Sequence, residues 1–339
     1  MIPSINERLD DARLADVFSR YTLDPQYKLL SSWHAFTLEV YRGKTPFILR
    51  ISDRSHRSRA DIEGELEWIE WARKGGVTAP LIIPSQYGQI TEVIDAGPSL
   101  FTAVLFEKLS GRPVADADWN AGLFERWGAL VGRLHRLSLG FRPAKPRAFW
   151  HDSDFLNVEA YIPDDLYEIK RAGRELIEEI KSLPRDPSSF GMIHADVYQD
   201  NFFLLGNELQ LFDFDNCEYG FFASDVAIAL YAALWRVPAE ADRQAFSAMF
   251  LESFWTGYRT EFSLDDAQIE ALPLLLRLRD LLIYIVARKK LDLQNLTPIQ
   301  ARLLAERGNR IAARTPIVDV APTYHKIRRS PTNRQRQCR

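Results

Sequence analysis

One stretch of the sequence places carboxylates and an amide at spacings that suit phosphoryl transfer. Residues 194–201 read HADVYQDN, and Asp213 and Asp215 follow Asn201 after twelve and fourteen positions. Phosphoryl transfer needs a carboxylate that takes the proton of the attacking hydroxyl, and oxygen ligands for magnesium at the phosphates. Asp196 suits the first task, and Asn201 with Asp213 suits the second. Because side chains alternate along an extended chain, Asp215 lies on the same side as Asp213 and is a candidate for a second metal or acceptor contact.

The elements ahead of this stretch are mostly short strands. A short amphipathic helix is expected at 6–20, and Gly75 and Gly76 mark the end of a longer helical pattern. Strands are expected at 27–30, 35–41, 46–52, 90–94 and 100–107, and a helix is expected at 58–74. The pattern predicts a small antiparallel sheet with one helix.

Beyond Gly111 the periodicity becomes helical. Helices are predicted at 119–139, 163–181, 223–235, 239–259 and 265–290, and an island of strands (192–193, 202–205 and 209–212) interrupts them. We therefore predict an α+β fold with two lobes, a small antiparallel β-sheet lobe and a larger, mainly α-helical lobe. The predicted divisions are 1–108 for the nucleotide-binding lobe, 109–325 for the catalytic and acceptor-binding lobe, and 326–339 for a disordered basic tail.

The charge distribution narrows the class of partner. The last fourteen residues carry six basic side chains and no acid, whereas the remainder holds 37 basic and 46 acidic residues, a net charge of −9. An acidic body argues against nucleic acid as a partner.

The apolar run 281–287 is too short to cross a bilayer, and the two cysteines suggest no disulfide framework. We expect a cytoplasmic protein with no membrane partner, and the sequence defines no oligomeric state.

These motifs together resemble a known group of enzymes. The Asp-Asn-Asp spacing, Leu134-His135 late in the first long helix, and Ser224-Asp225-Val226-Ala227 after the metal loop resemble the aminoglycoside phosphotransferase and choline kinase superfamily, which has a protein-kinase-like fold. Residues 212–230 look most like bacterial homoserine kinase type II and stress-response kinases. The resemblance covers about residues 27–290 and implies ATP as co-substrate with Mg²⁺.

The resemblance also implies roles for residues of the first lobe. Arg50 on the third strand matches the basic residue that holds the α and β phosphates, and Glu65 matches the helix carboxylate that fixes it, with Glu63 and Glu67 as rivals. Arginine grips two oxygens at once, which a lysine does not. The segment from Glu107 to Leu109 is expected to bind adenine through its backbone.

Two further residues are expected to support the catalytic loop, and one loop departs from the kinase pattern. By the resemblance, His194 holds the loop by packing and hydrogen bonding, and Asp225 accepts backbone amides from it. The loop 31–35, which should cover the phosphates, contains no glycine and includes Trp33 and His34. Weak nucleotide affinity is one expected consequence.

The acceptor is expected to be a small molecule. Ala195 stands where regulated protein kinases have arginine, and only about a dozen residues separate Asp213 from Asp225, too few for a peptide-binding activation loop. Acidic groups such as Asp200, Asp215 and Glu218 favour a cationic acceptor. We predict transfer of the ATP γ-phosphate to a hydroxyl of an aminoglycoside-, homoserine- or amino-alcohol-like molecule. The alternatives are a stress-response-type serine/threonine protein kinase and an inactive nucleotide-binding module.

Overall fold

The computed structural model describes residues 9–32, 35–97, 99–238, 241–321 and 323. The chain forms two compact units: the first comprises 1–112, 142–147 and 203–215, and the second comprises 113–141, 148–202 and 216–339. The expected tail 326–339, and Trp33 and His34 of the glycine-poor loop, lie outside the described residues. The predicted division of the sequence after residue 108 stays a prediction.

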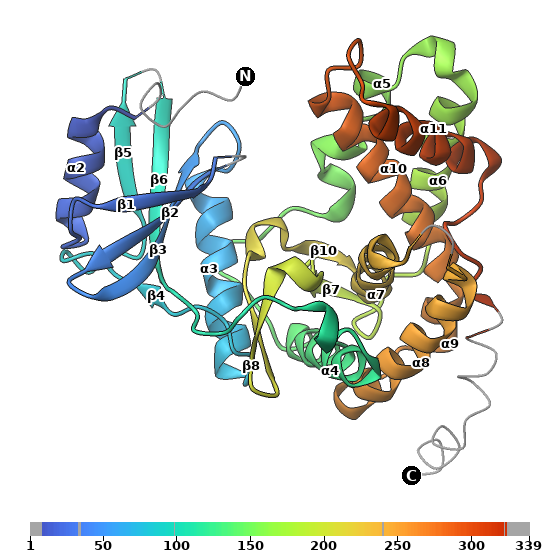
Figure 1. Ribbon diagram of the computed structural model, residues 1–339, viewed down its shortest axis with the longest axis horizontal. Helices are drawn as coiled ribbons and strands as arrows, with labels where there is room; N and C mark the ends of the chain where they lie inside the picture. Colours follow the sequence, from blue (N-terminus) through green and yellow to red (C-terminus); the bar gives the residue numbers. More distant parts are fainter. Residues whose placement is uncertain (1–8, 33–34, 98, 239–240, 322, 324–339) are drawn as a thin grey trace. The chain divides into compact units, whose positions relative to one another are not determined.

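The first unit is built on an antiparallel sheet of six strands (Figure 1). Its elements are α2 (Asp11–Arg20), β1 (Tyr27–Ser31), β2 (Ala35–Arg42), β3 (Thr45–Asp53), α3 (Arg59–Lys74), β4 (Ile82–Ile83), β5 (Glu92–Ala96) and β6 (Ser99–Glu107). The strand order is β1-β2-β3-β6-β4, and β5 also pairs with β6. Strand β5 lies two residues later than the sequence suggested, and the two-residue β4 was not predicted.

Alternation along β3 decides which side chains enter the core of this unit. Leu49 and Ile51 are fully buried in the hydrophobic cluster that also contains Val17 and Phe18 of α2. Because neighbouring residues of a strand point to opposite faces, Arg50 is directed to the other face, on which α3 lies. Figure 1 shows α2 and α3 on opposite sides of the sheet. The sequence of β3 thus presents one cation to α3.

A hairpin from later in the chain completes the first unit. Strands β8 (Phe202–Leu205) and β9 (Glu208–Leu211) pair, and Gly206 between them has a φ of 59°, a left-handed conformation that glycine adopts without strain. The Leu211 N–H donates to the Thr78 carbonyl (2.8 Å), and the Gly111 N–H donates to the Gln210 side chain (2.8 Å). These bonds attach the segment that precedes Asp213 to the first unit.

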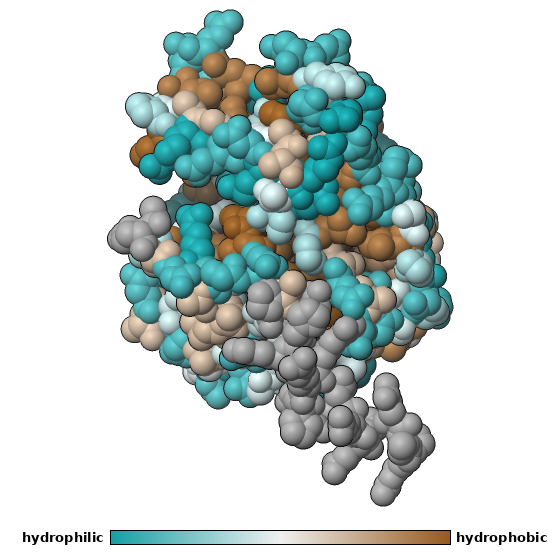
Figure 2. Space-filling view, turned by 90° about the vertical axis from the view of Figure 1, so that its right-hand side faces the viewer, coloured by the Kyte–Doolittle hydropathy of each residue, from teal (hydrophilic) through white to brown (hydrophobic). Residues whose placement is uncertain are grey.

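The second unit is mainly helical. Its elements are α4 (Ala121–Ser138), α5 (Val158–Tyr161), α6 (Tyr167–Lys181), β7 (Phe190–Ile193), β10 (Glu218–Phe221), α7 (Phe222–Ala233), α8 (Arg243–Glu261), α9 (Asp266–Glu270), α10 (Leu272–Lys290) and α11 (Pro298–Ala313). Strands β7 and β10 pair antiparallel. Figure 2, which faces this unit, shows polar side chains over most of its surface with apolar ones between them. No helix in the described ranges is long and apolar enough to span a membrane.

One difference from the predicted helices has a local cause. The helix expected at 265–290 is two helices, α9 and α10, because Pro273 has no N–H to donate to the carbonyl of Ile269 and so begins a new helix.

Helices α4 and α8 pack with their backbones close together, and a Cβ built on Gly257 would lie 1.7 Å from the Glu125 carbonyl oxygen. Strand β10 and helix α11 were not predicted.

Candidate active site

The loop after β7 holds Asp196 through its neighbours in the second unit. The Asn201 side-chain nitrogen donates to the Asp196 carbonyl oxygen (2.8 Å) and to its carboxylate Oδ2 (3.3 Å). The Asn216 amide donates weakly to the same oxygen at 3.4 Å, and Arg279 of α10 donates from Nη2 to Oδ1 at 2.9 Å. Hydrogen-bond donors therefore orient both carboxylate oxygens of Asp196. A carboxylate that accepts a proton from a hydroxyl must be positioned in this way.

The backbone of this loop is strained and is held by one buried carboxylate. Ala195 has a φ of 62°, in the left-handed region that residues with a Cβ seldom adopt. Asp225 of α7 is fully buried and accepts the backbone N–H groups of His194 (3.0 Å) and Ala195 (2.8 Å). Two charge-assisted hydrogen bonds offset the strain and fix the loop ahead of Asp196.

A buried histidine of α4 holds Asp225 from behind. His135 Nε2 lies 3.3 Å from the Asp225 carboxylate, its Nδ1 lies 2.7 Å from the Tyr258 hydroxyl, and the ring stacks on Phe222. Burial lowers the pKa of His135, and Asp225 only partly opposes this. The imidazole is therefore neutral near pH 7, with Nε2–H positioned to donate to Asp225. His194 is also fully buried, at the end of β7.

In the first unit, Arg50 and Glu65 form a buried ion pair. The Arg50 Nη1 and Nη2 atoms donate to the two Glu65 oxygens at 2.8 and 2.6 Å, and the guanidinium lies over the Phe106 ring. Burial would lower the pKa of Arg50, but the charge and hydrogen bonds of Glu65 raise it above its ordinary value. The rival carboxylates are engaged elsewhere: Glu63 pairs with Arg59, and Glu67 accepts a backbone N–H.

The two hydrogen bonds to Glu65 use Nη1 and Nη2 of Arg50 and leave its Nε. The Arg50 Nε is buried and makes no hydrogen bond within the described residues. A buried donor without an acceptor costs about 1–3 kcal/mol, so such atoms in native proteins commonly face a ligand or water. This orphaned donor fits a phosphate oxygen. Of the other residues expected to bind ATP, Glu107 is exposed and donates its N–H to Leu81 (2.8 Å), and Leu109 is half-buried just after β6.

The two acids after β9 have different surroundings in the first unit. Asp213 is exposed and adopts a φ of 61°, again a left-handed conformation. Asp215 is half-buried, with Arg57 Nε at 3.4 Å and His56 Nε2 at 3.9 Å from its carboxylate. Burial alone would raise the pKa of Asp215, but His56, Arg50 and Arg57 hold it well below its usual range. Its predicted contact with a second metal or the acceptor stays a prediction.

The donor atoms suit a hard cation such as Mg²⁺. No three His, Cys, Asp or Glu side chains gather into a metal cluster in the described part of the chain. Magnesium, however, is commonly held by one or two protein oxygens together with phosphates and water. The Asn201 nitrogen is used on Asp196, which leaves its amide oxygen for a cation, and Asp213 supplies an exposed carboxylate.

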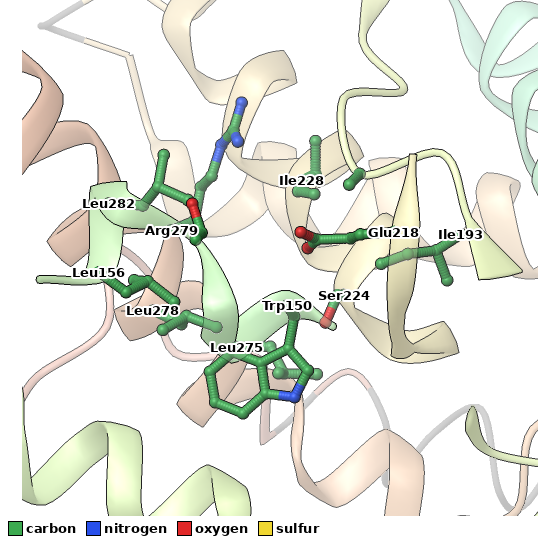
Figure 3. A pocket seen from close by; sticks show the side chains of 12 residues that line it. Trp150, Leu156, Ile193, Glu218, Ser224, Ile228, Leu275, Leu278, Arg279 and Leu282 are labelled. Carbon is green, nitrogen blue, oxygen red and sulfur yellow. The ribbon is translucent and has the colours of Figure 1, made fainter. Parts of the chain in front are cut away.

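A pocket opens beside the Asp196 loop in the second unit (Figure 3). Its empty space is about 470 Å³, part of it open solvent, and Trp150 and four leucines form its apolar walls. Ala195 also lines it, next in sequence to Asp196, and so do the ionisable side chains of Glu218 and Arg279. Figure 3 shows Glu218 reaching from β10 toward the α10 wall, on which Arg279 lies. Sequence reasoning noted Glu218 only as one of several acids, and it missed Arg279 and Trp150.

Comparisons with known proteins identify the family of this chain. Residues 28–268 match the phosphotransferase enzyme family, APH. Amicoumacin kinase from Bacillus subtilis (strain 168) is 31% identical over 90% of this chain and 92% of its own, and a homoserine kinase from Agrobacterium fabrum is 27% identical over 77% and 83%.

A solved relative extends the comparison to the fold. Amicoumacin kinase hAmiN, in complex with AMP-PNP, Ca²⁺ and Ami, superposes with a TM-score of 0.90 at 31% identity, covering 95% of this chain and 98% of the other. The predicted α+β, kinase-like fold and the predicted superfamily are confirmed. The chain belongs to the phosphotransferase enzyme family and is an ATP-dependent kinase that acts on a small molecule.

Proposed function

We propose that the chain transfers the γ-phosphate of ATP to a hydroxyl group of an amine-bearing, amphipathic small molecule, with an amicoumacin-like antibiotic as the first candidate acceptor. The pocket beside the Asp196 loop carries this proposal. Apolar walls suit the body of such a molecule, and Glu218 suits an ammonium group. The likeness to amicoumacin kinases over nearly the whole length of both chains supports the same acceptor class.

In the proposed phosphoryl transfer, each residue of the site has a separate role. The acceptor hydroxyl attacks the γ-phosphorus, the new O–P bond forms as the bond to the β–γ bridging oxygen breaks, and ADP departs. Asp196 receives the hydroxyl proton, and Asn201 keeps its carboxylate aimed. Arg50, fixed by Glu65, holds phosphate oxygens of ATP. Asn201 and Asp213 would hold magnesium, which neutralises charge on the phosphates when bound.

The test is phosphate transfer from γ-labelled ATP with magnesium to separate pools of amicoumacin, homoserine, amino alcohols, aminoglycosides and a protein mixture. We expect labelling of the amicoumacin pool. Asp196→Asn should lower the rate by about 10²- to 10⁴-fold, the usual contribution of general acid–base catalysis. The control is Asp165→Asn, because Asp165 is an exposed aspartate of the second unit that does not line the pocket, and its loss should leave the rate unchanged.

The other outcomes identify what is wrong. A labelled homoserine or aminoglycoside pool would keep the reaction and replace the acceptor, whereas a labelled protein would point to the protein kinase alternative. If ATP raises the melting temperature but no pool is labelled, the proposed reaction is contradicted and the nucleotide-binding module is favoured. Glu218→Gln offers an independent check, because it should raise the KM for an amine-bearing acceptor and leave the KM for ATP unchanged.

A further inference from the structure

Arg279 places a cation directly on the proposed catalytic base. It lies in the middle of α10, on a wall of the pocket whose neighbours Leu275, Leu278 and Leu282 are apolar. Its side chain is only 14% exposed. Asp196 is its one hydrogen-bond and ion-pair partner within the described residues. Since a guanidinium carries five N–H donors, most of its donor capacity is not used by Asp196.

The contact places Arg279 beside the reacting atoms. A hydroxyl that gives its proton to Asp196 must lie within about 2.6–3.2 Å of the carboxylate, and the γ-phosphorus must approach that hydroxyl to about 3–3.5 Å. The Arg279 Nη2 atom is itself 2.9 Å from the same carboxylate. The guanidinium is therefore within one side-chain rearrangement of the transferred phosphoryl group.

The charge balance of the step favours such a rearrangement. Before transfer, the positive charge of Arg279 is compensated by the Asp196 carboxylate. As the hydroxyl proton passes to Asp196, that carboxylate loses its negative charge, while the transferred phosphoryl group carries charge on its three equatorial oxygens. The guanidinium then has a neutral partner on one side and an anion on the other.

We propose that Arg279 is a catalytic residue that moves from Asp196 to the equatorial oxygens of the transferred phosphoryl group, acting as an arginine finger supplied by the chain itself. This inference rests on the proposed function. It assigns to α10 a part in the chemistry, in addition to the wall it forms for the acceptor. Arginine suits the role because its planar fork can bind two phosphate oxygens at once.

The test compares Arg279→Ala and Arg279→Lys with Arg277→Ala, on the acceptor that the wild type phosphorylates. Arg277 is a matched control, because it lies on the same helix, its side chain is also 14% exposed, and it pairs with Glu179. We expect Arg279→Ala to lower kcat by about 10²- to 10³-fold, as removal of one transition-state donor does, with both KM values within about threefold of the wild type. Arg279→Lys should recover part of the loss, and Arg277→Ala should match the wild type.

A second readout separates chemistry from folding. Wild-type enzyme with the acceptor should bind ADP with aluminium fluoride, a mimic of the transferred phosphoryl group, more tightly than ADP alone, and Arg279→Ala should lose that difference while its melting temperature stays near that of the wild type. Millimolar guanidine added to Arg279→Ala should restore part of kcat.

Four outcomes would overturn the proposal. An increased acceptor KM with unchanged kcat would make Arg279 an acceptor-binding residue, and an increased kcat would make it an inhibitory contact on Asp196. If kcat and both KM values are unchanged in Arg279→Ala, Arg279 has only a structural role. A wild type that phosphorylates no acceptor overturns the proposed function and this inference together, whereas wild-type turnover with unaffected Arg279→Ala overturns this inference alone.

Discussion

The ion pair between Arg50 and Glu65 allows stability and nucleotide binding to be separated. Two short hydrogen bonds join the side chains, which are 10% and 1% exposed. Removing one partner of a buried pair costs about 3–5 kcal/mol, because it leaves a charge without compensation. Glu65→Gln should therefore lower the free energy of unfolding of the first unit by about 3–5 kcal/mol, a large part of the about 5–15 kcal/mol that a native protein has.

Replacement of both partners should behave differently. Arg50→Met with Glu65→Leu removes both charges and keeps apolar volume, and such exchanges are often neutral or stabilising by about 1–4 kcal/mol. The double variant still lacks the cation proposed for the phosphates. A charge-assisted hydrogen bond contributes about 1.5–3 kcal/mol, so the affinity of the double variant for ATP should be about 10- to 150-fold lower than that of the wild type.

The assay combines urea unfolding, with hydrogen exchange at amides of β3 and α3, and titration calorimetry with ATP. Glu63→Gln is the control, because the Glu63 pair with Arg59 is more exposed and should contribute about 0–1 kcal/mol. A stable double variant that binds ATP as tightly as the wild type would refute the phosphate role of Arg50. A loss below about 1 kcal/mol in Glu65→Gln would refute the energetic argument.

Three further variants test the supports of the catalytic loop and the helix packing. Asp225→Asn loses one of the two acceptors for the loop amides, so it should cost about 1–3 kcal/mol and reduce kcat, measured by urea unfolding and turnover; unchanged kcat would contradict the loop assignment. The pKa of His135 is lowered in the folded protein. As the pH falls below about 6.5, the imidazole therefore takes up a proton more readily in the unfolded chain than in the folded one. The free energy of unfolding should then decline by up to about 1.4 kcal/mol per pH unit. His135→Asn should show a shallower decline over the same pH range, and an identical slope would exclude His135 as its source. Gly257→Ala should lower the melting temperature, because its Cβ would collide with the Glu125 carbonyl and overpacking costs about 1–3 kcal/mol. Gly88→Ala is the control: its Cβ would have open space around it, so it would report only the backbone strain at its φ of +76°.

The sequence predicted those parts of the site that depend on local spacing. Asp196 and Asn201 are five residues apart in one loop, so their hydrogen bond follows from the loop itself. The Arg50–Glu65 pair was expected from the family resemblance. Strand alternation explains it in the structure, because it directs Arg50 to the face on which α3 lies. The likeness to homoserine kinases was also expected, whereas amicoumacin kinases were not among the groups anticipated.

Contacts made by distant segments were beyond sequence patterns. Arg279 is 83 residues from Asp196, and a single arginine on an apolar helix does not reveal which loop it meets. The ion pair of Asp215 with Arg57 joins residues 158 positions apart, so the spacing between Asp213 and Asp215 did not reveal it. The break before α10 followed from Pro273, a signal that the long apolar periodicity obscured.

Above all, we propose that this chain moves the γ-phosphate of ATP to a hydroxyl of a small molecule with Asp196 as the base. The most direct measurement is phosphorus NMR of the reaction with ATP, magnesium and the candidate acceptor, run in parallel with Asp196→Asn. We predict a new phosphate monoester resonance on the acceptor, equal in amount to the ADP formed, with the rate lowered by about 10²- to 10⁴-fold in the variant. ADP formed together with free phosphate only, or an ester formed equally fast by Asp196→Asn, would contradict it.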